Sequence, residues 1–543
     1  SESILARVHL VFRIDPERPP QYDVARLENE IIELTRSWED RLLEALTEAE
    51  GEEHAIQLLE QYQEAFPSAY REHFDARTAV QDIEHIAGLH DRHLALSFYR
   101  LPNGGSEALR FKVFRREHPM ELSDVIPVLE HLGLRVVSEH PYEIRLADGN
   151  SVWLHNFNLV YALADAIDLA SVKQPFQEAF AAVWGGRAES DAFNRLVLGA
   201  GLNWRQVVVL RALAHYMRQT LFNFTEDYIA SALVSHLEIT RSLIALFEAR
   251  FDPSVSGGFE ARQALIEERR QRIITALDQV QNLNEDRIIR RFLVMLDGCV
   301  RSNFYQRTRQ GKPKEYLALK FTPRRIPDIP EPRPLYEIFV YSPRVEAVHL
   351  RAGLVARGGL RWSDRLQDYR TEVLGLVKAQ QVKNALIVPN GAKGGFVCKQ
   401  LEDQGREAAQ REAIECYRTF IRGMLDLTDN LVAEQLQPPK QLVRLDGDDP
   451  YLVVAADKGT ATFSDIANDI SHQYHHWLGD AFASGGSQGY DHKAMGITAR
   501  GAWVAVQRHF RELGLDTQTE DFTVVGIGDM AGDVFGNGML LSE

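Results

Sequence analysis

A long helical stretch in the middle of the chain constrains the fold more than any other feature. From Leu163 to about Arg307, apolar residues recur with helical spacing, and breaks at 185–186, 199–201 and 253–258 contain glycine or proline. One hydrophobic core cannot serve 543 residues, so three or four domains are expected. We interpret the stretch as a helical spacer or oligomerisation module without a catalytic role.

The region before this stretch mixes strands and helices. Ala6 to Ile14 alternates apolar and polar residues as a strand does, and Val24 to about Leu59 has helical spacing that is interrupted near Gly51. Five further short segments resemble strands and one resembles a helix. The strands are Leu94–Tyr99, Leu109–Phe114, Leu134–Glu139, Tyr142–Leu146 and Val152–Val160, and the helix is Ser123–Leu132. The pattern predicts two small α+β modules of the ligand-sensing type.

The region after the stretch begins with a proline-rich run, Pro323–Pro334, which we interpret as a linker between domains. Short apolar strands and one long helix follow, which predicts an α/β domain. The strands are Tyr336–Val340, Glu346–Leu354, Val443–Leu445, Leu452–Ala456 and Thr523–Gly526, and the helix is Asp368–Leu386.

Composition and charge exclude several classes of protein. Lys and Arg number 61 against 77 Asp and Glu, and the net charge of −16 argues against binding to nucleic acid or to an anionic membrane. Cys299, Cys398 and Cys416 are too few and too scattered for a disulfide framework, which fits a reducing cytoplasm. No secretory signal and no membrane span are expected. We interpret the chain, from Ser1 to Glu543, as an internal piece of a longer polypeptide.

Three cationic side chains fall close together in the sequence, beside what we expect to be glycine-rich turns. They are Arg357, Lys383 and Lys393, and Gly358 and Gly359 follow directly after the first. Glycines remove side-chain bulk and let the backbone approach a ligand closely. Such a cluster suits a small dicarboxylate.

The two lysines differ in their expected surroundings. Lys383 lies near the end of the predicted helix, and Gln380 lies one turn earlier on roughly the same face. Lys393 is expected in a turn bracketed by Gly391 and by the glycine pair 394–395. In a buried, cation-rich pocket the charged form of a lysine is disfavoured, so such a lysine can act as a general base near neutral pH.

An acidic segment follows, with the sequence Asp446-Gly-Asp-Asp-Pro450, and Asp457 stands at the end of the next apolar strand. Open α/β sheets place ligands at that end of a strand. Asp457 could exchange a proton with a substrate amine or balance the lysine cluster, or it could be a structural cap. A calcium loop is disfavoured because the glycine at loop position six is missing.

A glycine-rich motif lies near the end of the chain and predicts a dinucleotide phosphate cradle after a strand. Its residues are Gly526, Gly528, Gly532 and Asp533. The spacing is G-x-G-x-x-x-G rather than G-x-G-x-x-G, and the acidic ribose partner would lie at or beyond the chain end. The histidines at 472, 475 and 476 have no carboxylate or cysteine at ligand spacing, so no metal is expected.

Together these segments resemble the glutamate dehydrogenase superfamily, and most closely its large bacterial NAD-specific branch. The resemblance covers about 335–543 and rests on six motifs. They are Arg357-Gly-Gly-Leu-Arg361, Gln380-Gln-Val-Lys383-Asn-Ala385, Pro389-Asn-Gly-Ala-Lys393-Gly-Gly395, Ala455-Ala-Asp457-Lys-Gly-Thr460, Thr462-Phe-Ser-Asp-Ile-Ala-Asn468 and Gly526-Ile-Gly-Asp-Met-Ala-Gly-Asp-Val-Phe-Gly-Asn-Gly538.

The resemblance implies reversible NAD-dependent oxidative deamination of glutamate to 2-oxoglutarate and ammonia. Lys393 would activate water, Lys383 with Gln380 would hold the α-carboxylate, and Asp457 would exchange protons with the amine. Arg357 stands where small family members have a lysine for the side-chain carboxylate, and it argues for an acidic substrate. The nucleotide domain is barely begun, so this fragment should not turn over substrate unaided.

The implied fold class is multidomain α/β and α+β, in a cytoplasmic homo-oligomer (tetramer or hexamer) that a small amino-acid or metabolite effector could regulate. Six segments are expected. They are a partial ACT-like module with helices (1–88), an ACT-like module (89–162), a helical domain (163–322), the linker (323–334), the substrate domain (335–515) and the start of a Rossmann-type NAD domain (516–543).

Two other functions fit parts of the same pattern. The chain could belong to a dehydrogenase of another amino acid, since the lysine motifs do not by themselves select the substrate side chain. It could also be a noncatalytic module in which residues 1–160 sense an amino acid.

Overall fold

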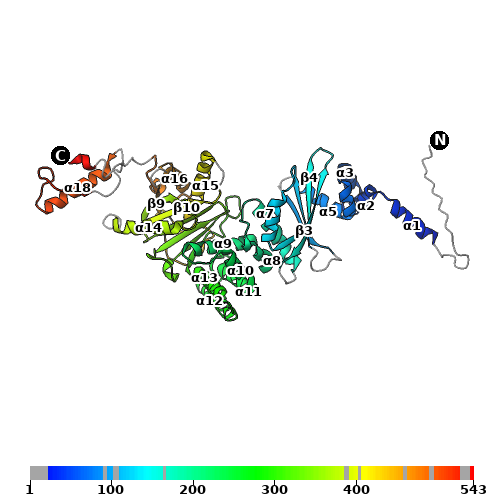
Figure 1. Cartoon of the computed structure of the whole chain (residues 1–543), viewed down its shortest axis with the longest axis horizontal. Helices are drawn as coiled ribbons and strands as arrows, with labels where there is room; N and C mark the ends of the chain where they lie inside the picture. The colour runs from blue at the N-terminus through cyan, green and yellow to red at the C-terminus, as the bar shows by residue number, and fades with distance from the viewer. Residues whose placement is uncertain are drawn as a thin grey trace. The chain divides into compact units, whose positions relative to one another are not determined.

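The computed structural model describes residues 23–89, 94–101, 109–162, 167–383, 390–401, 405–456, 461–487, 495–525 and 538–542. Figure 1 shows the whole chain as a ribbon. Two compact units are present, one formed by Ser1–Ile126 with Leu134–Ala162 and the other by Pro127–Gly133 with Leu163–Glu543.

The described part of the first unit opens with five helices. They are α1 (Val24–Thr35), α2 (Trp38–Glu50), α3 (Glu52–Tyr62), α4 (Ser68–His73) and α5 (Ala76–Ala87). The predicted interruption at Gly51 is confirmed, because that residue has φ +83° between α2 and α3. A further break falls at Ser37, whose side chain caps α2 in a capping box with Asp40. The predicted strand Ala6–Ile14 lies outside the described residues.

Four antiparallel strands follow, in the order β1-β2-β4-β3. They are β1 (Leu94–Arg100), β2 (Leu109–Arg116), β3 (Leu134–Arg145) and β4 (Ser151–Tyr161), and α6 (Leu122–His131) comes between β2 and β3 in the sequence. The two strands predicted over 134–146 form one strand, β3, with an irregularity at Val136/Ser138. Pro141 is tolerated there because β3 is an edge strand, where one backbone N–H is not needed.

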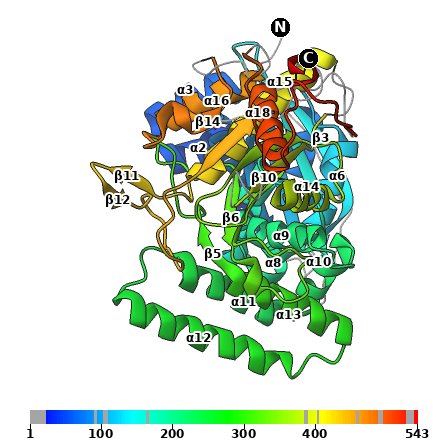
Figure 2. The same cartoon turned by 90° about the vertical axis from the view of Figure 1, so that its left-hand side faces the viewer.

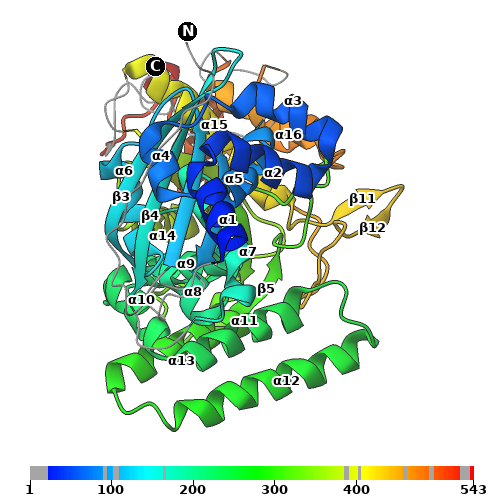
Figure 3. The same ribbon diagram turned by 90° about the vertical axis from the view of Figure 1, so that its right-hand side faces the viewer.

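One face of this sheet packs against α2, α3 and α5 (Figure 3). Phe114, Ile144 and Leu154 of the strands share a core with Leu46 and Ile83 of the helices. The helices that cover this face come from residues 38–87, so they and the strands of 94–161 share one core.

Helices dominate the chain from 169 to 298. They are α7 (Leu169–Trp184), η1 (Ala192–Asn194), α8 (Arg195–Ala200), α9 (Trp204–Gln219), α10 (Glu226–Ser235), α11 (Leu237–Phe251), α12 (Gly258–Leu277) and α13 (Leu283–Gly298). All three predicted breaks are confirmed, and Figure 2 shows α11, α12 and α13 of this region. Within the described residues no single helix is long and apolar enough to cross a membrane, and α10 with α11 reaches that length only as a pair bent by 102°.

An eight-stranded sheet forms the centre of the second unit, in the order β14-β13-β9-β10-β8-β7-β6-β5. Its strands are β5 (Cys299–Ser302), β6 (Leu317–Phe321), β7 (Tyr336–Tyr341), β8 (Val345–Arg351), β9 (Arg357–Trp362), β10 (Ala392–Cys398), β13 (Val453–Ala456) and β14 (Ala483–Ser484). Strands β5 to β8 and β10 pair antiparallel, whereas β10, β9, β13 and β14 pair parallel. The sheet begins at Cys299, so the prediction that the helical stretch continues to about Arg307 was wrong. The proline-rich run, which contains η2 (Pro323–Arg325), joins the neighbouring strands β6 and β7, so its interpretation as a linker between domains was also wrong.

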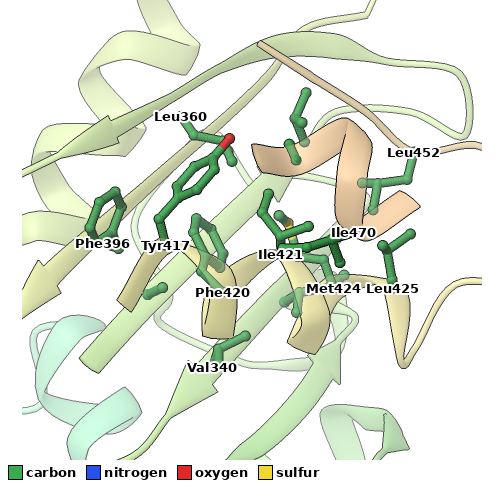
Figure 4. Packing of buried hydrophobic residues seen from close by; sticks show 14 of the residues in the cluster. Val340, Leu360, Phe396, Tyr417, Phe420, Ile421, Met424, Leu425, Leu452 and Ile470 are labelled. Carbon is green, nitrogen blue, oxygen red and sulfur yellow. The ribbon is translucent and has the colours of Figure 1, made fainter. Parts of the chain in front are cut away.

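Helices cover both faces of this sheet, as Figure 1 shows. On one face lie α9 and α14 (Tyr369–Lys383), and on the other lie α15 (Arg406–Leu425) and α16 (Ala461–Gln473). The core under α15 and α16 joins Phe396 and Leu360 of the strands to Phe420 and Ile470 of the helices (Figure 4). This layering is that of an α/β domain.

The remaining described elements are short or lie late in the chain. They are the hairpin β11 (Asn430–Val432) and β12 (Gln435–Gln437), η3 (Gly479–Ala481), α18 (Ile497–Glu512) and η4 (Met539–Leu541). Two strand predictions were wrong. Residues 443–445 form no strand, because only the Leu445 N–H bonds to the sheet, at the carbonyl oxygen of Val300. Residues 523–525 form none either, and Val525 is 90% exposed.

Candidate active site

Lys393 is the second residue of strand β10, so the prediction that it lies in a turn was wrong. It pairs with Leu350 of β8 on one side, and β10 runs parallel to β9 on the other. The two following glycines are needed for packing rather than for turning. A Cβ atom added at Gly394 would lie 2.5 Å from Cδ2 of Leu360, and one at Gly395 would lie 2.6 Å from Cγ2 of Val373.

Arg357, Gly358 and Gly359 likewise lie in a strand, β9, and not in a turn. A Cβ atom at Gly358 would lie 1.4 Å from the carbonyl oxygen of Ala392, so only glycine fits between the strands there. A Cβ atom at Gly359 would meet Nζ of Lys393 at 3.7 Å. An added methyl group would lie there in ordinary contact, so the missing side chain at Gly359 leaves space of that size beside the lysine amine.

The open space lies on the face of the sheet that α14 covers. Side chains alternate along a strand, so Arg361 shares the face of Gly359. Arg361 Nε lies 3.0 Å from Oε1 of Glu372 in α14. Leu360, between them, points to the opposite face and into the core under α15 and α16. Lys393 is thus held between the sheet and α14.

Gln380 ties the C-terminal half of α14 to the start of β9. Its Nε2 donates a hydrogen bond of 2.8 Å to the carbonyl oxygen of Arg357. Its Oε1 is buried and has no hydrogen-bond partner among the described residues. Gly391 makes room for this amide, because a Cβ atom there would lie 2.3 Å from Oε1. A buried acceptor without a partner is one that a ligand or water donor can satisfy.

The charges near Lys393 are unbalanced within the described part of the chain. Lys393 is half-buried and Arg357 is exposed, and neither forms an ion pair with a described carboxylate. An ammonium and a guanidinium on neighbouring strands can bind the carboxylates of a small acid. The amide of Gln380 thus contacts the backbone of Arg357, and Lys393 lies on the neighbouring strand β10, whereas a shared substrate site of these residues with Lys383 stays a prediction.

Several predicted site residues cannot be located in this way. The backbone of Lys383 ends α14, but its side chain lies outside the described residues, as do Asp457 and the glycine-rich residues Gly526, Gly528, Gly532 and Asp533. Strand β13 ends at Ala456, and its Ala455 pairs with Gly359, so this strand leads to the same region of the sheet. The roles of these residues stay predictions.

The sequence analysis missed a buried network of charges on the opposite face of the sheet. Arg301 lies 2.9 Å from Asp429 and 2.6 Å from Asp446, while Lys320 lies 2.5 Å from Asp446 and 2.7 Å from Asp449. Arg351 also pairs with Asp449. Burial alone would raise the pKa of Asp449, but Arg351 and Lys320 hold it below its usual value. The signal that could have revealed the network is a basic residue inside each of three apolar strands.

These ion pairs explain the acidic segment after residue 445. Asp446 and Asp449 are buried partners of strand cations, whereas Asp448 between them is 65% exposed and pairs with Arg444. The network anchors the segment that leads into β13, and so it positions that strand beside β9. The carboxylates of Asp446 and Asp449 thus compensate buried cations of the sheet.

His349 lies next to this network, in β8. Burial, together with the nearby charge of Arg351, lowers the pKa of His349 to about 3. Its Nε2 has no hydrogen-bond partner among the described residues. His349 is thus held neutral inside the sheet.

The histidines at 472, 475 and 476 form no group of metal ligands among the described residues. Nε2 of His472 lies 2.7 Å from Asp480, and burial lowers the pKa of His476 to about 4. Among the residues whose placement is described, no group of three His, Cys, Asp or Glu side chains could hold a metal ion.

Family models match the chain in five consecutive segments. The largest match is to the bacterial NAD-glutamate dehydrogenase catalytic domain, over residues 272–543. Four further glutamate dehydrogenase models match upstream. They are the ACT2 domain (1–39), helical motif 2 (45–89), the ACT3 domain (93–172) and helical motif 3 (188–253). The catalytic match begins before β5, in agreement with the membership of β5 and β6 in the large sheet.

Curated relatives align over the whole chain. The NAD-specific glutamate dehydrogenase of Halomonas elongata is 57% identical, that of Pseudomonas aeruginosa 54% and that of Mycobacterium tuberculosis 48%, each over 100% of this chain. The alignments cover 34%, 34% and 35% of the three relatives, so the chain spans about a third of their length.

Proposed function

The chain belongs to the bacterial NAD-specific glutamate dehydrogenase family, and on that premise we propose that it supplies the substrate half-site of an enzyme that deaminates L-glutamate oxidatively to 2-oxoglutarate and ammonia. The observation that carries this proposal is the space that Gly359 leaves beside Nζ of Lys393, together with the buried Oε1 of Gln380, which has no partner among the described residues. That space has cationic groups without carboxylate partners among the described residues, as a dicarboxylate ligand requires.

Each residue has a proposed role in this site. Arg357 binds the side-chain carboxylate of glutamate, and Lys383 with Gln380 binds the α-carboxylate. The backbone at Gly358 and Gly359 lets the substrate lie close to β9. Holding both carboxylates fixes the substrate Cα in one orientation, which is the contribution that positioning makes to the rate.

The proposed proton transfers use one lysine and one aspartate. NAD, when bound, supplies the acceptor for the hydride of the substrate Cα. Lys393 accepts a proton from the water that attacks the substrate imine carbon, and Asp457 exchanges a proton with the departing amine. We assign NAD binding to Gly526, Gly528 and the 532–533 pair from their sequence spacing alone, and no step above depends on where they lie.

Titration calorimetry with the full-length enzyme tests the substrate assignment. Glutamate and 2-oxoglutarate should bind, and 2-oxoisocaproate, which lacks the second carboxylate, should bind at least tenfold more weakly. Arg357→Leu should remove this preference, whereas Arg365→Leu, an exposed arginine paired with Asp368, should keep it. Equal preference in wild type and Arg357→Leu would favour the alternative, a dehydrogenase of another amino acid.

We further propose a regulatory role for the first unit and revised domain limits for the second. The four-stranded sheet of residues 94–161 is the candidate for binding an amino-acid or metabolite effector, and 1–88 is the candidate for a partial module of the same kind. The helical segment 163–298 would form contacts between the subunits of a cytoplasmic homo-oligomer, which would be a tetramer or a hexamer. The substrate domain would begin at Cys299 rather than at 335, because β5 and β6 are strands of its sheet.

Removal of the large unit tests the regulatory proposal. A fragment of residues 1–162 is mixed with a panel of amino acids and its thermal midpoint is measured. A shift with one amino acid only would support an effector site in this unit, and a shift seen only in the full-length enzyme would assign the amino acid to the substrate site.

A further inference from the structure

Two of the three cysteines face each other across the core under α15. Cys398 is the last residue of β10, and by strand alternation it shares the face of Phe396. The Phe396 ring lies 5.8 Å from the Tyr417 ring and 6.3 Å from the Phe420 ring of α15 (Figure 4). Cys416 precedes Phe420 by one helical turn and so lies on the same side of α15. The strand therefore carries Cys398 along the helix towards Cys416.

Hydrogen bonds fix the two thiols at this position. The Cys416 thiol donates to the carbonyl oxygen of Arg344 at 3.4 Å, and the backbone N–H of Lys399, next to Cys398, donates to the same oxygen at 2.8 Å. Cys416 belongs to the core under α15, and Cys398 packs against the same core. Cys416 is buried and Cys398 is half-buried, so solvent reaches the pair from the side of Cys398.

We propose that Cys398 and Cys416 form a reversible disulfide, which makes the end of β10 a site of oxidative modification. Hydrogen peroxide is the oxidant. The Cys398 thiolate attacks one peroxide oxygen, the O–O bond breaks, and a sulfenic acid forms as hydroxide leaves and is protonated to water. The Cys416 sulfur then attacks the sulfenic sulfur, an S–S bond forms, and a second water leaves. Overall, two thiols and one peroxide give one disulfide and two waters.

The order of these steps follows from the surroundings of the two thiols. The contact with Cys398 and the burial of Cys416 both raise the pKa of Cys416, so it does not ionise first. The third cysteine is an internal control, because burial raises the pKa of Cys299 to about 12 and its thiol donates to the carbonyl oxygen of Arg301.

The disulfide would tie α15 to the strand whose other end carries Lys393. A dithiol reductant would restore both thiols.

Peptide mapping of the full-length enzyme tests the proposal. The reduced protein is treated with one equivalent of hydrogen peroxide, free thiols are alkylated, and a tryptic digest is analysed without reduction. Trypsin releases Cys398 in the peptide 394–399 and Cys416 in the peptide 412–418. We expect these two peptides joined, lighter than their sum by two hydrogens, and separated again by dithiothreitol.

Variants and a stability measurement distinguish the pair from general oxidation. The joined peptide should persist in Cys299→Ser and vanish in Cys398→Ser, and Cys398 is the safer substitution because it is only half-buried. Oxidation should raise the thermal midpoint of wild type and leave that of Cys398→Ser unchanged. Alkylated Cys416 beside a sulfinic or sulfonic acid at Cys398, with no joined peptide, would overturn the proposal.

Discussion

Two groups of basic side chains on the large sheet, one under α15 and α16 and one under α14, differ in whether they have carboxylate partners. On the face under α15 and α16, Arg301, Lys320 and Arg351 are buried, and each has a carboxylate within ion-pair distance. On the face under α14, Lys393 and the neighbouring Arg357 have no such partner among the described residues. The two groups come closest at Arg351 and Lys393, whose strands β8 and β10 pair directly.

The difference separates charges that hold the fold from charges that are available to a ligand. A cation removed from water must be compensated, and the first group is compensated by carboxylates of the chain itself. The second group keeps partial contact with solvent and lies beside space that glycines leave open. A basic residue in a strand is therefore informative about function only when its carboxylate partners are known.

The largest expected effect is on the α14 face. Lys393→Ala in the full-length enzyme should lower kcat by about 10²–10⁴-fold, equivalent to about 3–5.5 kcal/mol, because it removes the proposed general base. The measurement is initial-rate formation of NADH from glutamate. Lys378→Ala, an exposed lysine of α14, is the matched control and should leave kcat within about twofold. Retained activity in Lys393→Ala would show that Lys393 is not the general base, and the unpaired cations would then have no demonstrated catalytic role.

On the opposite face, substitution should affect stability first. Asp449→Asn leaves Lys320 and Arg351 without one of their carboxylates, and the free energy of unfolding should fall by about 3 kcal/mol or more. Asp448→Asn is its neighbour and control; this exposed pair with Arg444 should contribute less than about 1 kcal/mol. Urea unfolding of both variants gives the two values. Equal decreases in the free energy of unfolding would show that the buried Asp449 contributes no more to stability than the exposed Asp448.

The adjacent glycines of β9 allow a sharper test of the open space. Gly358→Ala would place a methyl group onto the Ala392 carbonyl oxygen, and it should lower the free energy of unfolding by about 1–3 kcal/mol. Gly359→Ala makes ordinary contacts, so stability should stay within about 0.5 kcal/mol while KM for glutamate rises. Thermal unfolding and steady-state kinetics of both variants are compared. An unchanged KM in Gly359→Ala would mean that the substrate lies elsewhere.

The smallest effect concerns the neutral histidine beside the ion-pair network. The pKa of His349 is about 3 in the folded protein and about 6.5 when the chain is unfolded, so the unfolded state binds the proton first. The stabilisation is fully present above pH 6.5 and is lost as the pH falls, by at most about 1.4 kcal/mol for each pH unit. Urea unfolding between pH 7 and 5.5 should show a shallower decline in His349→Gln than in wild type. Identical slopes would contradict the burial of a neutral imidazole.

Local patterns in the sequence determined much of the secondary structure. The breaks between α7 and α12, the four strands of residues 94–161 and the helix that ends at Lys383 all follow from spacing and from glycine or proline within a few residues. The grouping of Arg357, Lys383 and Lys393 at one substrate site, inferred from motifs close together along the chain, stays a prediction. The family resemblance rests on these short-range patterns.

Only the tertiary structure decided what the glycines of those motifs do. A glycine that turns the chain and a glycine that admits a neighbouring backbone look alike in sequence, and β9 is a strand because β10 and β13 supply its hydrogen bonds. The buried ion pairs were equally hidden, since Arg301 meets carboxylates more than a hundred residues away. Sequence spacing reports contacts within a helical turn or a strand, whereas pairing across a sheet and compensation of buried charge depend on which distant segments the fold brings together.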